Sequence, residues 1–188
     1  MKRTYYFIVT GYNVEPYIEK CIDSILGQDF DGSRYAIVVC LDGCSDDSAM
    51  KIDFFRVNAI FNTSNMGAAY SRAECINLLN HTCNDDDVII TVDADDYLAH
   101  DQVLNRLEKE YDNGADVTYG NLATISHPNN PILKSGFTKE ELEGKNFRSY
   151  AWKSSQLRTF KYKLYKNLHE DNFKDKDGKW LKNYTDRS

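Results

Sequence analysis

Three carboxylates lie within four residues of one another, directly after a strongly apolar stretch. Residues 88–92 are mostly β-branched and apolar, and Asp93, Asp95 and Asp96 follow them. A buried strand over residues 88–92 would place these acids at its carboxyl end, at the mouth of a sheet. Three like charges so close together repel one another unless a cation lies among them. A hard divalent metal, with the phosphates that such metals carry, is therefore the first hypothesis for this site.

The acids belong to a chain in which predicted strands and helices alternate. Apolar runs predict strands over residues 5–10, 35–41, 57–61, 88–92 and 116–119. Helical spacing of apolar residues predicts helices over 17–26, 68–79 and 103–111, and the polar segment 45–48 predicts the start of a short fourth helix. This alternation is typical of βαβ units and predicts an α/β fold with a mostly parallel sheet. After residue 120 the pattern changes to an expected hairpin over 122–134 and then to a mixed, aromatic and basic region.

Polar segments follow each of the first four predicted strands. They begin at Thr10, Asp42, Asn62 and Asp93 and are rich in Asn, Asp and Gly. In open parallel sheets, ligands bind outside the carboxyl ends of the strands, so the four segments predict one binding site. The chain has no GxGxxG and no GxxxxGK[ST], which argues against a dinucleotide dehydrogenase and a P-loop NTPase. A nucleotide here would need its diphosphate neutralised by a metal on Asp95 and by a guanidinium such as that of Arg72.

The segments TGYN, LDGCSDDS, NMGAAYSR and VDADDYL, in this order, resemble the nucleotide-sugar-binding half of inverting glycosyltransferases of family 2. The resemblance covers about residues 4–121 and implies the GT-A fold. That fold has a Rossmann-like N-terminal half, with helices on both sides of a mostly parallel sheet, and a mixed acceptor-side region. The resemblance implies one catalytic domain over 1–188, with a donor half at 1–121 and an acceptor-side half at 122–188. We expect it to be a shortened form or to be followed by further domains.

The resemblance also implies roles for the matching positions. The nucleotide-sugar-binding residues would be Thr10, Tyr12, Asn13 and Glu15 in the first uridine-side loop, Asp42 at the base, and Asn65, Gly67 and Arg72 along the nucleotide and diphosphate. Asp93 matches the acid near the ribose, Asp95 the ligand of Mn²⁺ or Mg²⁺, and Asp96 a supporting or sugar-contacting residue. Gly11 stands where a proline is common, which suggests a looser loop.

The family's catalytic base is an acidic residue much later in the chain. Asp186 is the candidate, and Glu170 or Asp171 is the alternative. In an inverting transfer this carboxylate takes the proton of the acceptor hydroxyl as it attacks the anomeric carbon, which is worth about 10²–10⁴ in rate.

The expected protein is a metal-dependent hexosyl- or deoxyhexosyltransferase that moves a sugar from a UDP-sugar donor to a hydroxyl of a glycan or glycoconjugate acceptor. Two alternatives stay open. A sugar nucleotidyltransferase normally has a glycine-rich basic loop after its first strand, but residues 10–15 contain no Lys or Arg. The other alternative is a nucleotide- or glycan-binding module without a catalytic base.

Charge and composition narrow the setting. The net charge is −6, but residues 1–144 carry −13 and residues 145–188 carry +7. A basic tail beside an acidic body indicates docking on that body, binding of a phosphate-rich ligand, or simply a solvated lysine-rich surface. The negative net charge of the whole chain argues against nucleic acid as a partner. No apolar run reaches the roughly 20 residues of a membrane span. Five cysteines without a CxxC pair indicate reduced thiols in a cytoplasmic protein.

Overall fold

The computed structural model describes residues 2–126, 136–144, 149, 153 and 155–181, and its centre is a six-stranded sheet. The strands are β1 (Tyr5–Gly11), β2 (Tyr35–Asp42), β3 (Asn58–Asn62), β4 (Val88–Asp93), β5 (Val117–Gly120) and β6 (Ser155–Lys161), in the spatial order β3-β2-β1-β4-β6-β5. The helices are α1 (Ile18–Leu26), α2 (Ala68–Leu78), α3 (Val103–Asp112), α4 (Lys139–Gly144) and α5 (Tyr162–Tyr165), with 3₁₀ turns η1 (Gly32–Arg34), η2 (Asp47–Lys51) and η3 (Glu170–Phe173). The predicted α/β fold is confirmed.

Four strands run parallel, and their register brings the predicted polar segments to one edge. β1 lies between β2 and β4, and Thr10 pairs with Cys40 on one side and with Asp93 on the other. Asp42, at the end of β2, pairs with Asn62 at the end of β3. The prediction that all four strand ends share one edge of the sheet is therefore confirmed.

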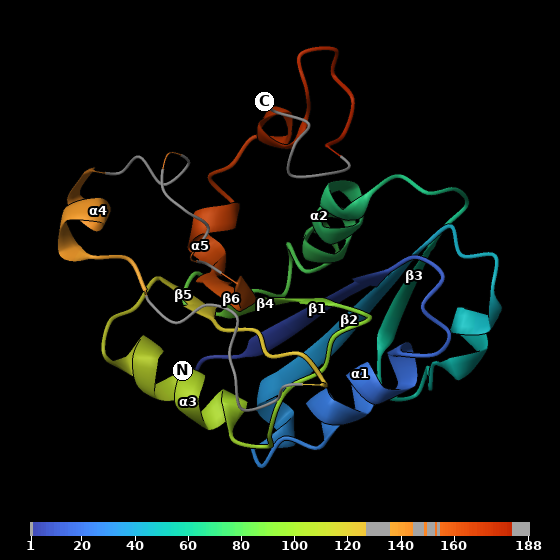
Figure 1. Ribbon diagram of the computed structural model, residues 1–188, viewed down its shortest axis with the longest axis horizontal. Helices are drawn as coiled ribbons and strands as arrows, with labels where there is room; N and C mark the ends of the chain where they lie inside the picture. Colours follow the sequence, from blue (N-terminus) through green and yellow to red (C-terminus); the bar gives the residue numbers. More distant parts are fainter. Residues whose placement is uncertain (1, 127–135, 145–148, 150–152, 154, 182–188) are drawn as a thin grey trace.

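Alternate residues of the strands face two separate layers of helices. Figure 1 shows α1 and α3 on one side of the sheet and α2 and α5 on the other. On β1, Tyr5, Phe7 and Val9 pack with residues of α1 and α3, whereas Tyr6 and Ile8 pack with α2 and Tyr162. The central strands β1, β2 and β4 are largely buried on both faces, as their nearly continuous apolar runs predicted.

Sequence analysis did not predict β6. This strand runs antiparallel between β4 and β5, so β5 pairs with β6 instead of joining the parallel set. Its fully or nearly buried residues are polar, namely Ser155, Thr159 and Lys161, and they break the apolar alternation that marks a strand. Residues 122–126, the expected first arm of a hairpin, form no strand, and 127–134 lie outside the described residues.

The basic C-terminal region docks on the acidic body. Lys161 Nζ lies 3.3 Å from Asp86 and 3.2 Å from Asp116, and Lys163 Nζ lies 2.8 Å from Asp116. Lys166 pairs with Asp85. Of the three explanations for the basic tail, docking is the one confirmed for these lysines.

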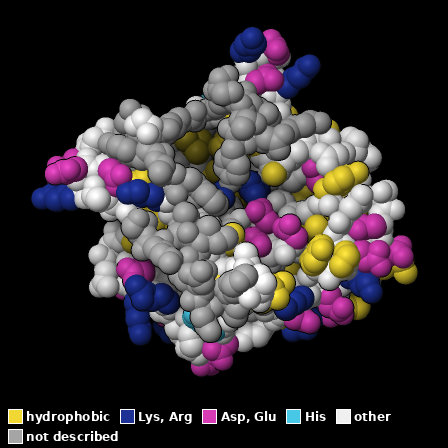
Figure 2. Space-filling model, viewed as in Figure 1, with side chains coloured by type: hydrophobic (Ala, Val, Ile, Leu, Met, Phe, Trp, Pro, Cys, Tyr) yellow, Lys and Arg dark blue, Asp and Glu magenta, His cyan; other side chains and the backbone are white. Residues whose placement is uncertain are grey.

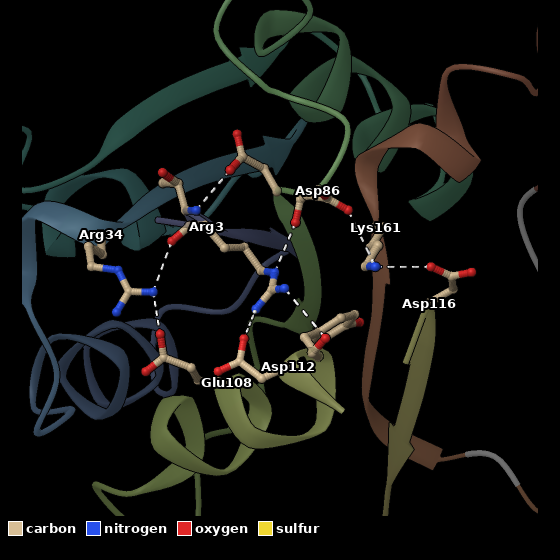
Figure 3. A network of polar contacts seen from close by, with 10 residues as sticks. Arg3, Arg34, Asp86, Glu108, Asp112, Asp116 and Lys161 are labelled. Atoms are coloured by element: carbon tan, nitrogen blue, oxygen red, sulfur yellow. Dashed lines mark hydrogen bonds and ion pairs between the residues drawn. The ribbon is translucent and has the colours of Figure 1, made fainter. Parts of the chain in front are cut away.

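A second set of polar contacts closes the amino edge of the sheet (Figure 3). Arg3 donates to the Asp86 carbonyl and to the Asp112 carboxylate, both at 3.1 Å, which ties the start of β1 to the segment before β4 and to the end of α3. Arg34 donates to the carbonyl of Arg3 and pairs with Glu108 of α3. Arginine and lysine therefore fix the edge opposite the predicted site.

Two expectations from composition can also be compared with the structure. The five cysteines are all free thiols. Within the part of the chain that the structure describes, no helix is long and apolar enough to cross a membrane.

We predict that Thr159→Val destabilises the fold by about 1–3 kcal/mol, because it orphans buried hydroxyls. Thr159 Oγ1 is hydrogen-bonded to the Tyr111 hydroxyl at 2.6 Å and to Thr118 Oγ1 at 2.7 Å. Burial raises the pKa of Tyr111 to about 12, so its hydroxyl stays neutral and needs a partner. Urea unfolding followed by circular dichroism measures the change. The exposed Thr63→Val is the control, expected within about 0.5 kcal/mol of wild type. Equal stabilities for the two variants would contradict the assignment.

Candidate functional site

Two side chains from different elements hold the Asp93 carboxylate. Arg72 Nη2, from α2, donates to Asp93 Oδ1 at 2.5 Å. Gln156 Nε2, from the start of β6, donates to Asp93 Oδ2 at 2.6 Å. Because β6 runs antiparallel to β4, its first residues lie beside the last residues of β4. Both oxygens of Asp93 are thus fixed, and the guanidinium offsets their charge.

Asp95 and Asp96 differ in their surroundings. Asp95 is exposed and makes no hydrogen bond or ion pair with another described residue. Asp96 is half-buried, and burial raises the pKa of its carboxyl, with further increases from the charges of Asp95 and Asp93. Arg158, on β6, opposes this rise. Burial and the negative charges of the same three acids also raise the pKa of the Cys21 thiol, on α1, to about 12.

Arginines supply part of the positive charge that the three acids require. Arg72 binds Asp93 directly, and Arg158 acts electrostatically on Asp96. Figure 2 shows Asp and Glu side chains gathered beside Lys and Arg side chains near the middle of this face. These two arginines offset part of the charge of the acids, and a metal among them stays a prediction.

The residues nevertheless fit a divalent metal. Among the described residues, no three His, Cys, Asp or Glu side chains are grouped to hold a metal ion by themselves. Mg²⁺ is usually held by one or two carboxylates, with substrate phosphates and water as its other ligands. Asp95, as an exposed hard oxygen donor beside a compensated Asp93, matches that smaller requirement.

Asp42 holds a loop together. It is 4% exposed, and its carboxylate accepts hydrogen bonds from Asn62 Nδ2 at 2.7 Å, the Met66 amide at 2.9 Å and the Gly67 amide at 2.7 Å. Gly67 begins α2 with a φ of 93°, a conformation that favours glycine. The structure therefore gives Asp42 a clear role in fixing the segment between β3 and α2; contact with a base stays a prediction.

Backbone and side-chain bonds join the loops after β1 and β2. Asn13 Oδ1 accepts from the Ser45 amide at 2.8 Å, and Asp46 Oδ2 accepts from the Glu15 amide at 3.0 Å. Burial opposes ionisation of Asp46, but hydrogen bonds from Ser48 and from the Glu15 amide outweigh it and lower the pKa. Asp46 therefore caps η2, and together with Asn13 it orders the two loops.

The loop after β1 is closely packed. A Cβ on Gly11 would lie 2.7 Å from Ala94 Cβ and 2.7 Å from Val14 Cγ2, so the chain has no room there for a larger residue. Thr10 is buried beneath it, and its carbonyl accepts from the Ala94 amide at 2.9 Å. Glycine at the position where a proline is common thus allows the residues after β1 and β4 to approach closely, and the expectation of a looser loop at Gly11 is wrong.

Two predicted nucleotide contacts are exposed. Tyr12 and Asn65 lie on the surface of the loops that follow β1 and β3, where a ligand can reach them. Of the residues predicted to bind the nucleotide sugar, four make loop-fixing contacts, namely Asn13, Glu15, Asp42 and Gly67. The others lie near the ends of β1, β3 and β4 or in the loops that follow, and Arg72 reaches Asp93 from α2.

The two described candidate bases, Glu170 and Asp171, are not part of this cluster. Glu170 and Asp171 lie on η3, where Glu170 pairs with Lys174 at 2.5 Å and Asp171 with His169 at 3.0 Å. Glu170 also lines a groove of about 340 Å³ beside α2, whose lining includes none of the β4 acids. Asp186 lies outside the described residues. The assignment of the base stays a prediction.

Sequence reasoning missed Gln156 and Arg158. Both lie on β6, and without that strand nothing in the sequence brings them near Asp93 or Asp96. The only available signal was the alternation in residues 155–161, which is weak because the buried positions are polar.

The chain also matches a known protein family. The family model described as Glycosyl transferase family 2 matches residues 6–172. The chain therefore belongs to glycosyl transferase family 2, as the four sequence segments indicated.

Curated relatives match over part of their length. The chain is 29% identical over 126 residues to the poly(ribitol-phosphate) beta-glucosyltransferase of Bacillus spizizenii, covering 63% of the chain and 19% of that protein. It is 34% identical over 116 residues to the glycosyltransferase GlyA of Streptococcus pneumoniae, covering 61% of the chain and 16% of that protein. The chain thus spans less than a fifth of the length of either relative.

Solved structures support the fold. The chain superposes on S. aureus TarS 1–349 in complex with UDP with a TM-score of 0.71 at 18% identity, covering 98% of the chain and 53% of TarS. The complex with UDP-GlcNAc gives 0.69 at 18% identity over 87% of the chain and 47% of TarS. The chain superposes on the mannosyltransferase PcManGT of Pyrobaculum calidifontis, in complex with GDP-Man and Mn²⁺, with a TM-score of 0.52. The identity is 21%, and the match covers 63% of the chain and 36% of that protein. The fold is of the GT-A type.

We predict that Asp42→Asn destabilises the protein by about 1–3 kcal/mol, because the new amide faces backbone N–H groups that need an acceptor. Urea unfolding measures the loss, and hydrogen exchange of the Met66 and Gly67 amides should speed up. Asp47→Asn, an exposed acid of the neighbouring loop, is the matched control and should stay within about 0.5 kcal/mol. Unchanged exchange in Asp42→Asn would refute the loop-fixing role.

Proposed function

We propose that this chain is the donor-binding part of a metal-dependent, inverting glycosyltransferase that uses a UDP-sugar and a glycan or glycoconjugate acceptor. The observation that carries the proposal is the edge where β1, β2, β3 and β4 end, with Asp95 exposed beside an Asp93 that Arg72 and Gln156 hold. Membership of glycosyl transferase family 2 supports the same reaction class.

Two observations support a uridine diphosphate donor. Solved structures of similar fold include complexes of TarS with UDP and with UDP-GlcNAc. In this chain the exposed Tyr12 and Asn65 offer contacts for a nucleoside, and Arg72 provides a guanidinium for phosphate oxygens. The roles of Thr10, Asn13, Glu15, Asp42, Gly67, Asp93 and Asp96 as donor-site residues are part of this proposal.

The proposed metal is Mn²⁺ or Mg²⁺ on Asp95. When bound, such an ion offsets the charge that develops on the leaving diphosphate. Asp93 is held in a fixed orientation, and Arg72 offsets its charge. Asp95 has no such partner among the described residues, so its carboxylate is available to bind the cation.

The base proposed for the acceptor hydroxyl is Asp186. A carboxylate in this role removes the hydroxyl proton as the oxygen attacks the anomeric carbon, and the configuration there inverts in one displacement. Glu170 and Asp171 are the alternatives, although both have ion-pair partners. A cytoplasmic location is proposed as well, and the five free thiols agree with it.

The rival reaction classes have less support. A sugar nucleotidyltransferase would need positive charge after β1, where residues 10–15 carry none. The fold alone does not separate the classes, because the 4-diphosphocytidyl-2C-methyl-D-erythritol synthase also superposes with a TM-score of 0.54. The family match separates them in favour of glycosyl transfer. A binding module without a base is excluded once turnover is measured.

We predict that UDP-sugars with Mn²⁺ stabilise the wild-type protein and that Asp95→Ala loses the metal-dependent part. A ligand at a hundred times its dissociation constant adds about 2.7 kcal/mol, which a thermal-shift screen of nucleotide sugars resolves. Asp95→Ala should unfold at the wild-type temperature without ligand, because the side chain is exposed. Asp101→Ala, another exposed acid, should behave as wild type. An enhancement of UDP affinity by Mn²⁺ in Asp95→Ala that equals the enhancement in wild type would sink the metal assignment.

We predict that Asp186→Asn binds donor normally but transfers sugar at least about a hundredfold more slowly, because the acceptor hydroxyl keeps its proton. Donor affinity comes from calorimetry with UDP, and turnover from UDP release in the presence of acceptor. Glu170→Gln and Asp171→Asn serve as parallel variants. Wild-type turnover in Asp186→Asn, with loss in one of the other two, would move the role to that residue.

A further inference from the structure

Gln156 has an unused acceptor at the centre of the site. Its Nε2 is committed to Asp93 Oδ2 at 2.6 Å, which fixes the orientation of the whole amide. Its Oε1 is buried and has no hydrogen-bond partner among the described residues. A buried carbonyl oxygen without a donor costs stability unless a ligand or water supplies one, and such groups concentrate where function requires them.

The neighbouring carboxylate has spare capacity too. Each oxygen of Asp93 accepts one hydrogen bond, Oδ1 from Arg72 and Oδ2 from Gln156, and a carboxylate oxygen can accept two. The site therefore presents two kinds of acceptor side by side, the amide oxygen of Gln156 and the carboxylate of Asp93. Asp93 ends β4, and Gln156 lies near the start of the antiparallel β6, at the edge of the sheet where β1 and β2 also end.

Two adjacent acceptors select a particular chemistry. The diphosphate of a nucleotide sugar carries no proton at neutral pH and cannot donate to either of them. Hydroxyl groups can donate, and both the ribose and the sugar ring of a nucleotide sugar carry pairs of neighbouring hydroxyls. A site built to hydrogen-bond a hydroxyl discriminates strongly against ligands that lack it.

We propose that Gln156 is a donor-specificity residue that holds Asp93 and accepts a hydrogen bond from a hydroxyl of the nucleotide sugar. This inference rests on the proposed function and extends the donor site from four parallel strands to the antiparallel β6. Gln156 thus has two tasks: Nε2 orients Asp93, and Oε1 reads the ligand.

The test pairs a change in the protein with a change in the ligand. Gln156→Met keeps the length and volume of the side chain but removes both polar atoms. Its affinity for UDP or UDP-GlcNAc should fall about tenfold, the loss of one to two hydrogen bonds. Calorimetry is then repeated with 2′-deoxy-UDP and 3′-deoxy-UDP. If the hydroxyl is on the ribose, one analogue binds wild type about tenfold more weakly than UDP but binds Gln156→Met no worse than UDP does.

The second arm locates a hydroxyl on the transferred sugar. In that case the deoxy-ribose analogues show no coupling with the variant, and Gln156→Met weakens UDP-GlcNAc by a clearly larger factor than UDP. Either result supports the proposal. The two results differ only in whether the hydroxyl belongs to the ribose or to the transferred sugar. Equal losses for every ligand, or wild-type affinity in the variant, would overturn it.

Two further variants separate ligand reading from folding. Thr159→Val lies on the same strand and lowers stability, but it should leave all ligand ratios unchanged. Gln156→Asn retains an amide on a side chain one methylene shorter, which cannot span both tasks. If Gln156→Met fails to fold, Gln156→Asn takes its place in the ligand series and should give the same pattern of affinities. A wild-type protein that binds neither UDP nor UDP-GlcNAc overturns the proposed function together with this inference. Binding without coupling overturns this inference alone.

Discussion

The parallel register of β1, β2, β3 and β4 is the constraint on which the site depends. It brings Thr10, Asp42, Asn62 and Asp93 to one edge before any loop contact forms. A slip of one residue would turn every side chain of a strand to the opposite face and expose part of the core, so the register is strongly fixed. The loops then need only local bonds. Those of Asp42 to the Met66 and Gly67 amides, and of Asp46 to the Glu15 amide, shape two of them around the edge.

Charge at this edge is balanced within the protein before any ligand arrives. Arg72 binds Asp93, and Arg158 stabilises the charged form of Asp96. Asp95 alone stays exposed without a protein partner among the described residues. Carboxylates crowded in a half-buried site tend to take up protons, as the raised pKa of Asp96 shows. The arginines limit this tendency, and one carboxylate stays available to a cation. The protein thus separates two tasks, keeping the cluster ionised and offering an oxygen to a ligand.

The parallel half of the fold could be predicted from sequence because its signals are local and agree with one another. Residues 88–92 are apolar and end in acids, and α1 has apolar residues at helical spacing up to its end near Gly27. β6 could not be predicted, because its buried residues Thr159 and Lys161 are polar and find their partners on distant elements, Tyr111 and Asp116. The same cause hid Gln156 and Arg158. Polar side chains become buried only when the sheet assembles, so their position is a tertiary property that periodicity does not carry.

The two edges of the sheet differ in how their carboxylates are treated. At the amino edge, Asp86, Glu108 and Asp112 each bind an arginine or a lysine, and these bonds join β1, α3 and β6 (Figure 3). At the carboxyl edge, Asp95 has no such partner, and the buried Oε1 of Gln156 has no donor among the described residues. Filling these positions with protein groups would stabilise the chain and close the site. The unfilled acceptors at one edge are the groups that the proposed ligand, with its hydroxyls and a cation, would satisfy, and the ion pairs at the other edge stabilise the sheet that carries them.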